Sequence, residues 1–272
     1  MAIPKSRLDG NWAEAKQKLG SQECCVVAVT GINAHLNALQ DYLSNSPSDV
    51  DLRARIRMTS SGHTYYDCHQ LRNAVTRTDK IRKEQNDKLE QVDSTDLCTL
   101  AFQELARGVS SLADGPFETT CRDVFLRVVC ANSYKAKDPM FHTDKAPLRG
   151  YVTLYGPGTD YMMRTSTPLE YMTLRGLGTL PGGLDTSLKR AGNLEFIVMK
   201  GDYYKHQSSL VTSFWQRNFA CVHRSPPATT GGRRVIVSLD LADGTDDREW
   251  CVVNKPREWR NGMTQRKSRL VA

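Results

Sequence analysis

The sequence predicts an α+β fold in which N-terminal helices cover an antiparallel β-sandwich or jelly-roll barrel. The first 117 residues contain long segments with apolar residues at helical spacing around one early strand. From residue 118 on, short alternating segments are separated by turns rich in Gly and Pro. A chain of 272 residues can bury a full core. We therefore expect residues 1–117 and 118–272 to pack as one compact unit.

The N-terminal part is expected to contain one buried strand and several helices. The apolar run CCVVAVTG (24–31) ends at a glycine and predicts a strand, and INAHLNALQDYLSN (32–45) predicts a helix that ends at a turn. The segment 94–114 carries an apolar stripe behind a Ser/Thr/Asp cluster that can cap a helix. The segment 78–90 is predicted to be a helix with a solvated face, because it mixes both signs of charge.

The C-terminal part is expected to supply the strands of the barrel. Alternating or apolar segments predict strands at 121–131, 148–161 and 193–202, the second of which ends in a Gly-Pro-Gly turn. The segments 217–227 and 233–241 are separated by the turn-forming residues ATTGG. We expect these two segments to form an antiparallel pair.

Composition excludes several classes of function. The chain has a net charge of +7, but its basic residues are dispersed along the sequence. We therefore expect no nucleic-acid partner. The positive charge fits an anionic small-molecule substrate equally well. No apolar run is long enough to span a membrane, and the N-terminus lacks the apolar core of a signal peptide, so we expect a cytoplasmic protein. The eight cysteines include no CxxC pair, and we expect reduced, mostly buried thiols. Oligomeric state is not readable from the sequence.

Two histidines and one aspartate form a candidate metal site. His142 and Asp144 lie two positions apart at the mouth of a predicted strand, where side chains at i and i+2 share a face. His223 lies in a later predicted strand. Two imidazoles and a carboxylate can occupy one face of an octahedral Fe(II) and leave positions open for a cosubstrate and dioxygen. The chance occurrence of H-x-D is the competing interpretation.

The strand that follows Asp144 offers polar groups on one face. Alternation places four polar side chains together, with apolar residues on the other face; they are Arg149, Tyr151, Thr153 and Tyr155. Thr153 is a candidate contact for a cosubstrate. The other three, together with Arg164, are candidates for binding a substrate carboxylate or amine.

An arginine beyond the distal histidine is expected to bind a carboxylate of the cosubstrate. Arg233 and Arg234 are both candidates, because a guanidinium can bind a carboxylate with two parallel hydrogen bonds. Arg234 is preferred, since Ser238 lies on its face of the predicted strand and adds a hydroxyl. Either arginine can also be part of a surface ion pair.

Three segments resemble a protein family of unknown function, number eighteen twenty-six. They are FHTDKAPLRGYVTLYGPGTDYM, VMKGDYY and VHRSPPATTGGRRVIVSLDL, and the resemblance covers about residues 118–245. The layout is also similar to that of the Fe(II)- and 2-oxoglutarate-dependent oxygenase superfamily, whose fold is a double-stranded β-helix. One departure is the spacing of Arg234 and Ser238, which stand four apart where that superfamily often has R-x-S.

The resemblance implies an enzyme with a defined set of cofactors. It would bind Fe(II) through His142, Asp144 and His223 and use 2-oxoglutarate and dioxygen to remove hydrogen from a C–H bond. The implied substrate is a small amino acid or a derivative, and the implied products are those of hydroxylation or oxidative cyclisation, such as aziridine formation from valine, in secondary metabolism. The alternatives are a cupin-like metal-dependent oxidase that uses no keto acid and a non-enzymatic metal-binding protein.

Overall fold

The structure is a computed structural model. It describes residues 10–21, 23–44, 50–60, 64–67, 94–113, 123–132, 139–180, 187–202, 204, 220–227, 232–241 and 251–253. Its helices are α1 (Trp12–Leu19), α2 (Asn33–Ser44), α4 (Ser94–Ser111) and α5 (Pro168–Leu177). Its strands are β1 (Val26–Val29), β2 (Val50–Ser60), β3 (Thr64–Asp67), β4 (Asp123–Ala131), β5 (Leu148–Tyr155), β6 (Asp160–Met162), β7 (Leu188–Arg190), β8 (Phe196–Lys200), β9 (His223–Arg224), β10 (Arg234–Leu241) and β11 (Cys251–Val253).

The strands form two antiparallel sheets. The larger sheet has the order β1-β8-β5-β10-β4-β2-β11, with β3 paired to β2. The smaller sheet has the order β7-β6-β9. Neighbours in the large sheet come mostly from distant parts of the chain; for example, residues 26–29 pair with residues 196–199.

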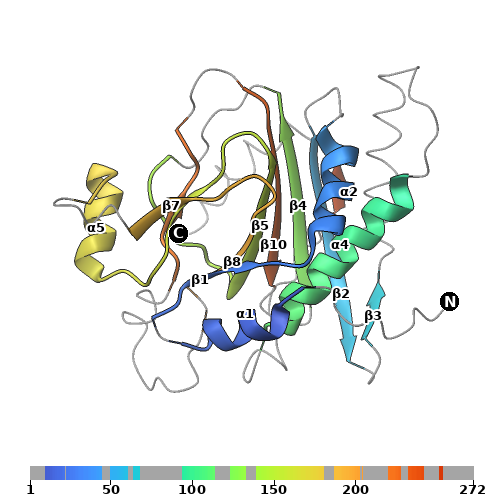
Figure 1. Ribbon diagram of the computed structural model, residues 1–272, viewed down its shortest axis with the longest axis horizontal. Coiled ribbons are helices and arrows are strands. Elements are labelled where there is room, and N and C mark those ends of the chain that lie inside the picture. The colour runs from blue at the N-terminus through green and yellow to red at the C-terminus, as the bar shows by residue number, and fades with distance from the viewer. Residues whose placement is uncertain are drawn as a thin grey trace, which may run out of the picture.

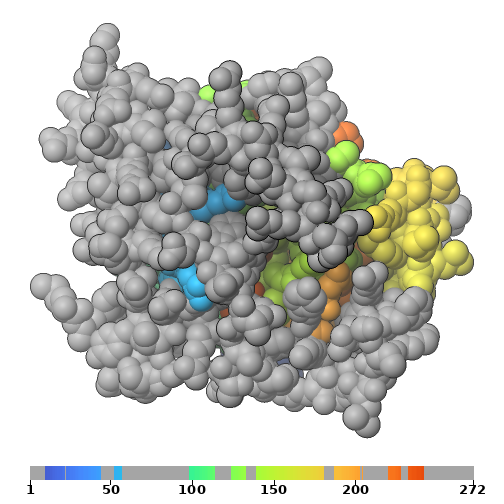
Figure 2. Space-filling model, turned by 180° about the vertical axis from the view of Figure 1, so that it is seen from behind, coloured from blue at the N-terminus to red at the C-terminus, as the bar shows by residue number. Residues whose placement is uncertain are grey.

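The elements stack in layers around two apolar cores and a smaller third one (Figure 1). On one face of the large sheet, apolar residues such as Val152, Val198 and Val237 pack with residues of α1, α2 and α4. The other face packs Tyr151 and Ile197 against residues of the small sheet and its flanks. The reverse face of the small sheet packs against α5, which lies at the far end from the other helices (Figure 1) and projects from the molecule in the opposite view (Figure 2).

The helix-facing core explains the alternating sequence of β10. Val235, Val237 and Leu239 are fully buried in that core. The residues that alternate with them project to the opposite face, and they are Arg234, Ile236, Ser238 and Asp240. Two glycines let the layers approach closely. A Cβ on Gly108 of α4 would lie 2.1 Å from the Trp12 ring, and one on Gly150 of β5 would lie 2.6 Å from the Phe196 ring.

Most of the predicted elements are confirmed. The expected helices at 32–45 and 94–114 correspond to α2 and α4, and the expected strands at 24–31, 121–131, 148–161 and 193–202 contain β1, β4, β5 and β8. The antiparallel fold with covering helices is likewise found. The helix expected at 78–90 lies outside the described residues. Cys24, Cys25, Cys98, Cys130 and Cys221 are free thiols, and all of them except Cys24 are buried.

One pairing prediction is wrong. We expected 217–227 and 233–241 to pair with each other, but β9 pairs with β6 in the small sheet and β10 lies between β5 and β4 in the large sheet. The segment between them therefore connects the two sheets. The prediction also missed α1, β2 and α5. No helix among the described residues is long and apolar enough to cross a membrane.

Candidate metal centre

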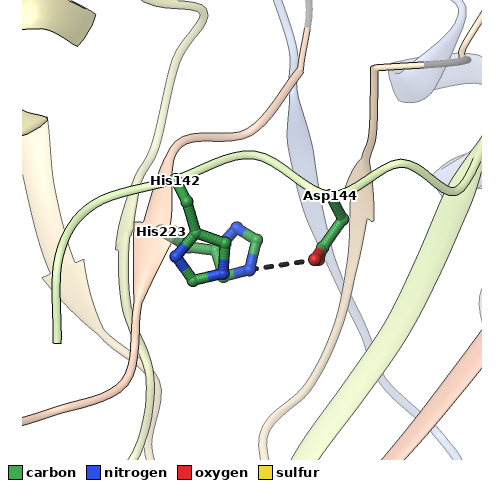
Figure 3. A group of neighbouring side chains, drawn as sticks. All are labelled: His142, Asp144 and His223. Atoms are coloured by element: carbon green, nitrogen blue, oxygen red, sulfur yellow. Dashed lines mark ion pairs between the residues drawn. The ribbon is translucent and has the colours of Figure 1, made fainter. Parts of the chain in front are cut away.

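His142, Asp144 and His223 meet at one point between the two sheets (Figure 3). One potential ligand atom from each residue lies within 4.8 Å of the other two. The two imidazole centroids are 4.5 Å apart. These separations allow a single ion to contact all three side chains at metal–ligand bond lengths of about 2 Å.

A backbone bridge brings the two histidines together. The amide of His142 donates to the carbonyl of His223 at 2.9 Å, and the amide of His223 donates back at 3.0 Å. His142 lies outside the named strands and pairs only through this isolated bridge, and Asp144 lies in the loop before β5. The three side chains thus converge, but not because i and i+2 share one face of a strand, and their role as metal ligands stays a prediction.

Both imidazoles point their Nε2 atoms at the site. Nδ1 of His142 lies 2.9 Å from the carbonyl oxygen of Met140, and Nδ1 of His223 lies 3.1 Å from that of Cys221. A carbonyl oxygen can only accept a hydrogen bond, so each Nδ1 carries the proton. In the neutral rings Nε2 then holds the lone pair, which is the arrangement of histidines that bind metals.

The Asp144 carboxylate has an oxygen suited to a cation. Oδ2 lies 3.1 Å from Nε2 of His223 and 2.6 Å from Nη1 of Arg149. Despite these short distances, this buried oxygen accepts no hydrogen bond of good geometry. A buried carboxylate oxygen without an aligned donor is costly, and a bound cation between it and the two Nε2 atoms would satisfy it.

Electrostatics favours the charged forms of the carboxylate and of His223. Burial by itself raises the pKa of Asp144, but the charges of Arg149 and His223 outweigh it and hold that pKa well below its usual range. Burial lowers the pKa of His223, yet the nearby Asp144 carboxylate raises the pKa of this imidazole overall. A proton on Nε2 of His223 and a metal ion would compete for the same place beside Asp144.

Arg149 connects the candidate ligand to β10. Besides Asp144 it binds Asp240, with Nε 2.5 Å from Oδ1 and Nη2 2.7 Å from Oδ2. The two carboxylates raise the pKa of Arg149 further, against the effect of burial. Its expected role in substrate binding stays a prediction, while the observed contacts hold the Asp144 carboxylate in place. Asp240 was missed, although its alternation with Ser238 in β10 placed it on the polar face.

Arg234 lies buried on the same face of the large sheet. Its Nη2 donates to the Tyr151 hydroxyl at 2.8 Å and to Thr159 Oγ1 at 3.3 Å, and its Nε donates to the carbonyl of Pro157 at 2.8 Å. Arg233 points elsewhere and donates to the Leu43 carbonyl in α2. Of the two arginines left open by the sequence, the structure brings Arg234 to the polar face.

The remaining predicted residues occupy different surroundings. Thr153 is fully buried, and its Oγ1 has no hydrogen-bond partner. Ser238 lies opposite Tyr151 in the register of the large sheet. Tyr155, at the end of β5, is 48% exposed, and Arg164 is paired with Glu170 of α5. The structure therefore does not bring Arg164 to the metal ligands, and its role in substrate binding stays a prediction.

A pocket of about 330 Å³ lies on the reverse side of the small sheet. Its lining residues are Phe141, Asp160, Leu188, Lys189, Arg190 and Arg224. Asp160 pairs with both Arg190 and Arg224, and the strand register puts these three residues on the face opposite to His223. The pocket is thus separate from the candidate metal centre.

Comparison with known proteins finds one family model that matches. The model described as "Protein of unknown function (DUF1826)" matches residues 52–240, so the resemblance inferred from three segments is confirmed and extends further toward the N-terminus. No curated protein matches.

Several solved structures are similar at low identity. The dioxygenase for auxin oxidation 1 of Arabidopsis thaliana, in a binary complex with 2-oxoglutarate, is 13% identical over 88% of this chain and 92% of that one, with a TM-score of 0.48. The corresponding rice dioxygenase is 12% identical over 96% and 94%, with a TM-score of 0.49. A putative 2OG-Fe(II) oxygenase family protein from Caulobacter crescentus is 11% identical over 94% and 95%, with a TM-score of 0.40. These likenesses are too remote to support an argument about this chain.

Proposed function

This chain belongs to the DUF1826 family, and from that premise we propose that it is a non-haem Fe(II)- and 2-oxoglutarate-dependent oxygenase. One observation carries the proposal. Two imidazoles with their Nε2 atoms directed inward and one buried carboxylate oxygen without an aligned donor surround a single point. Two histidines and one carboxylate are the ligand set of this class of iron site.

The residues present fit a ferrous ion. His142, Asp144 and His223 would hold it, and the carboxylate offsets part of its charge. When bound, the iron together with 2-oxoglutarate and dioxygen supplies the oxidation of an unactivated C–H bond. The protein's own contribution is to orient the ligands through the Met140 and Cys221 carbonyls and to hold Asp144 with Arg149.

Arg234 is the proposed contact for the distal carboxylate of 2-oxoglutarate. Its guanidinium is buried on the face of the large sheet that also carries Arg149 and Tyr151. The fully buried Thr153 hydroxyl, which lacks a partner on that face, is a second candidate contact. A keto acid in this space would receive charge-assisted hydrogen bonds from Arg234.

The proposed fold is a double-stranded β-helix. Two antiparallel sheets that share a core and enclose the candidate ligands support it. We keep the substrate class as a small amino acid or a derivative, with hydroxylation or oxidative cyclisation such as aziridine formation as the reaction. We place this reaction in secondary metabolism.

An anaerobic titration of the metal-free protein tests the proposal. Fe(II) followed by 2-oxoglutarate should produce a visible charge-transfer band, and admission of dioxygen with pooled amino acids should yield succinate. Binding of iron without the band and without succinate would favour a cupin-like oxidase that uses no keto acid. Tight zinc binding without any reaction with dioxygen would favour a non-enzymatic metal-binding protein.

A further inference from the structure

The two segments that carry the histidines are joined by little regular structure. His142 lies outside the named strands, and β9, which carries His223, has two residues. Two backbone hydrogen bonds, of 2.9 and 3.0 Å, link the segments and place the two imidazoles side by side (Figure 3). So short a pairing is at best marginally stable by itself. Side-chain contacts are therefore needed to keep the imidazoles at the separation that a shared metal ion requires.

The chain neighbours of both histidines meet on the reverse side of this bridge. Alternation along β9 turns Arg224 to the face opposite to His223. Phe141, which precedes His142, is fully buried in the core between the small sheet and α5. The guanidinium carbon of Arg224 lies over the Phe141 ring, 4.4 Å from its centroid. A cation at this distance from a ring face is attracted to it, so this contact joins the two segments a second time.

The guanidinium of Arg224 is held from two further directions. Its Nε donates to Oδ2 of Asp160 at 3.1 Å, and its Nη1 donates to the carbonyl of Gly178 at 3.3 Å. Asp160 lies opposite Arg224 in β6, and Gly178 ends α5 in the left-handed conformation. A planar guanidinium bound to two acceptors has little freedom to leave the Phe141 ring. The Arg224 side chain is 22% exposed, so water screens these contacts only in part.

We propose that Arg224 is a positioning residue that clamps Phe141 against β9 and thereby sets the separation of the two imidazoles. Phe141 and Arg224 are each adjacent to a histidine in the chain, so a change in their contact moves the imidazoles on the front face. The imidazole centroids are 4.5 Å apart, and metal–ligand bonds of about 2 Å leave little tolerance for a shift. This role rests on the proposed function only in requiring that both imidazoles bind a divalent metal ion.

A purely structural role for Arg224 is the competing explanation. Its bond to Gly178 satisfies a carbonyl group at the C-terminus of α5, which by itself stabilises a helix end. Loss of that bond alone would lower the melting temperature and leave the metal centre as it is. The two explanations therefore differ in what they predict for the histidine bridge and for metal binding.

Amide hydrogen exchange in the metal-free full chain tests the clamp at the bridge itself. The amides of His142 and His223 donate the two bridging hydrogen bonds. Arg224→Ala should speed their exchange about tenfold, the effect expected for loss of a partly desolvated cation–π contact. Amides of β10 should exchange as in the wild type. Arg190→Ala is the matched control, since Arg190 pairs with the same Asp160 from β7, and it should leave both bridging amides unchanged.

Titration with Co(II), whose visible spectrum reports coordination geometry, tests the consequence for the metal centre. In Arg224→Ala the Co(II) affinity should fall about 10–100-fold, as on loss of other outer partners of metal ligands, and the spectrum should change. Arg224→Lys keeps a cation near the ring and should recover part of the affinity. Phe141→Leu should resemble Arg224→Ala, and the double variant should lose little more than either single one, because both changes remove the same contact.

Three results would overturn the positioning role. They are wild-type exchange of both bridging amides in Arg224→Ala, equal acceleration of these amides in Arg190→Ala, and wild-type Co(II) affinity and spectrum in Arg224→Ala. A wild type that binds no Co(II) would refute the metal centre and this role together. Wild-type binding that Arg224→Ala leaves unchanged would refute the role alone.

Discussion

Nε2 of His223 lies 3.1 Å from Oδ2 of Asp144, although the two residues are far apart in the sequence. Nδ1 of the same imidazole faces the Cys221 carbonyl and keeps its proton. With a neutral ring, a lone pair on nitrogen would face a carboxylate oxygen. A cation between the two atoms makes this contact favourable, and that cation is either a proton on Nε2 or a metal ion.

Replacing Arg149 by methionine should weaken metal binding without abolishing it. Arg149 contacts the Asp144 carboxylate and is itself held by Asp240. Loss of such an outer partner lowers metal affinity by about 10–100-fold, and Arg149→Lys should restore part of it. Competition titration with Zn(II), which is redox-inert, measures the effect. Wild-type metal affinity combined with lost substrate binding would instead support the predicted substrate role of Arg149.

Replacing Arg234 by glutamine should weaken 2-oxoglutarate binding and leave metal affinity unchanged. The variant loses the charge that would pair with the distal carboxylate, and the apparent Kd for 2-oxoglutarate should rise about tenfold or more. Arg233→Gln is the matched control, since that guanidinium contacts α2 instead. If Arg233→Gln weakens 2-oxoglutarate binding and Arg234→Gln does not, Arg233 is the residue that binds the distal carboxylate.

Replacing Gly201 by alanine should disturb the loop that carries Asp144. A Cβ at this position would lie 1.9 Å from the Ala146 carbonyl oxygen and 2.7 Å from that of Asp144. Both are backbone atoms, so the loop must shift. We expect a lower melting temperature and weaker metal binding. Gly176→Ala in α5, where a Cβ meets nothing within 4 Å, should change neither for the worse. Equal behaviour of the two variants would show that the loop tolerates the shift.

The ion pair at the start of α5 should make stability depend on acid pH. The hydrogen bond from Arg164 lowers the pKa of Glu170 from 4.5 to about 2, and bonds within the Thr167 capping box add to this effect. Because the folded-state pKa is lowered, the contribution is complete above pH 4.5 and is lost as the pH falls toward about 2.

The variant Glu170→Gln tests this prediction, because the glutamine side chain does not titrate. In urea unfolding it should be less stable than wild type by about 0.5–1 kcal/mol near pH 6, a small value because the pair is partly exposed to water. The difference should shrink as the pH approaches about 2. A difference that stays constant across this range would exclude a contribution from the charge of Glu170.

Much of the fold could be predicted because its signals are local. The apolar period of α2 and α4 and the alternation of β5 and β10 are each contained in one segment. The wrong pairing of 217–227 with 233–241 has a non-local cause. A Gly-rich turn indicates a hairpin, but whether it joins partners in one sheet or connects two sheets depends on what each strand meets elsewhere.

The candidate site, too, could be predicted only in part from the sequence. The residue types His142, Asp144 and His223 are visible in the sequence, and so is the polar face of β5. The partner of Arg149 could not be assigned, because alternation places Asp240 on the polar face of β10 without giving the register between strands.

Iron content after anaerobic reconstitution tests the central claim most directly. The wild type and His35→Ala, a change in α2 away from the site, should each bind one Fe(II) per chain, whereas His142→Ala, Asp144→Ala and His223→Ala should retain almost none. A wild-type iron content in His142→Ala or His223→Ala, with the protein still folded, would contradict the assignment of these side chains as ligands.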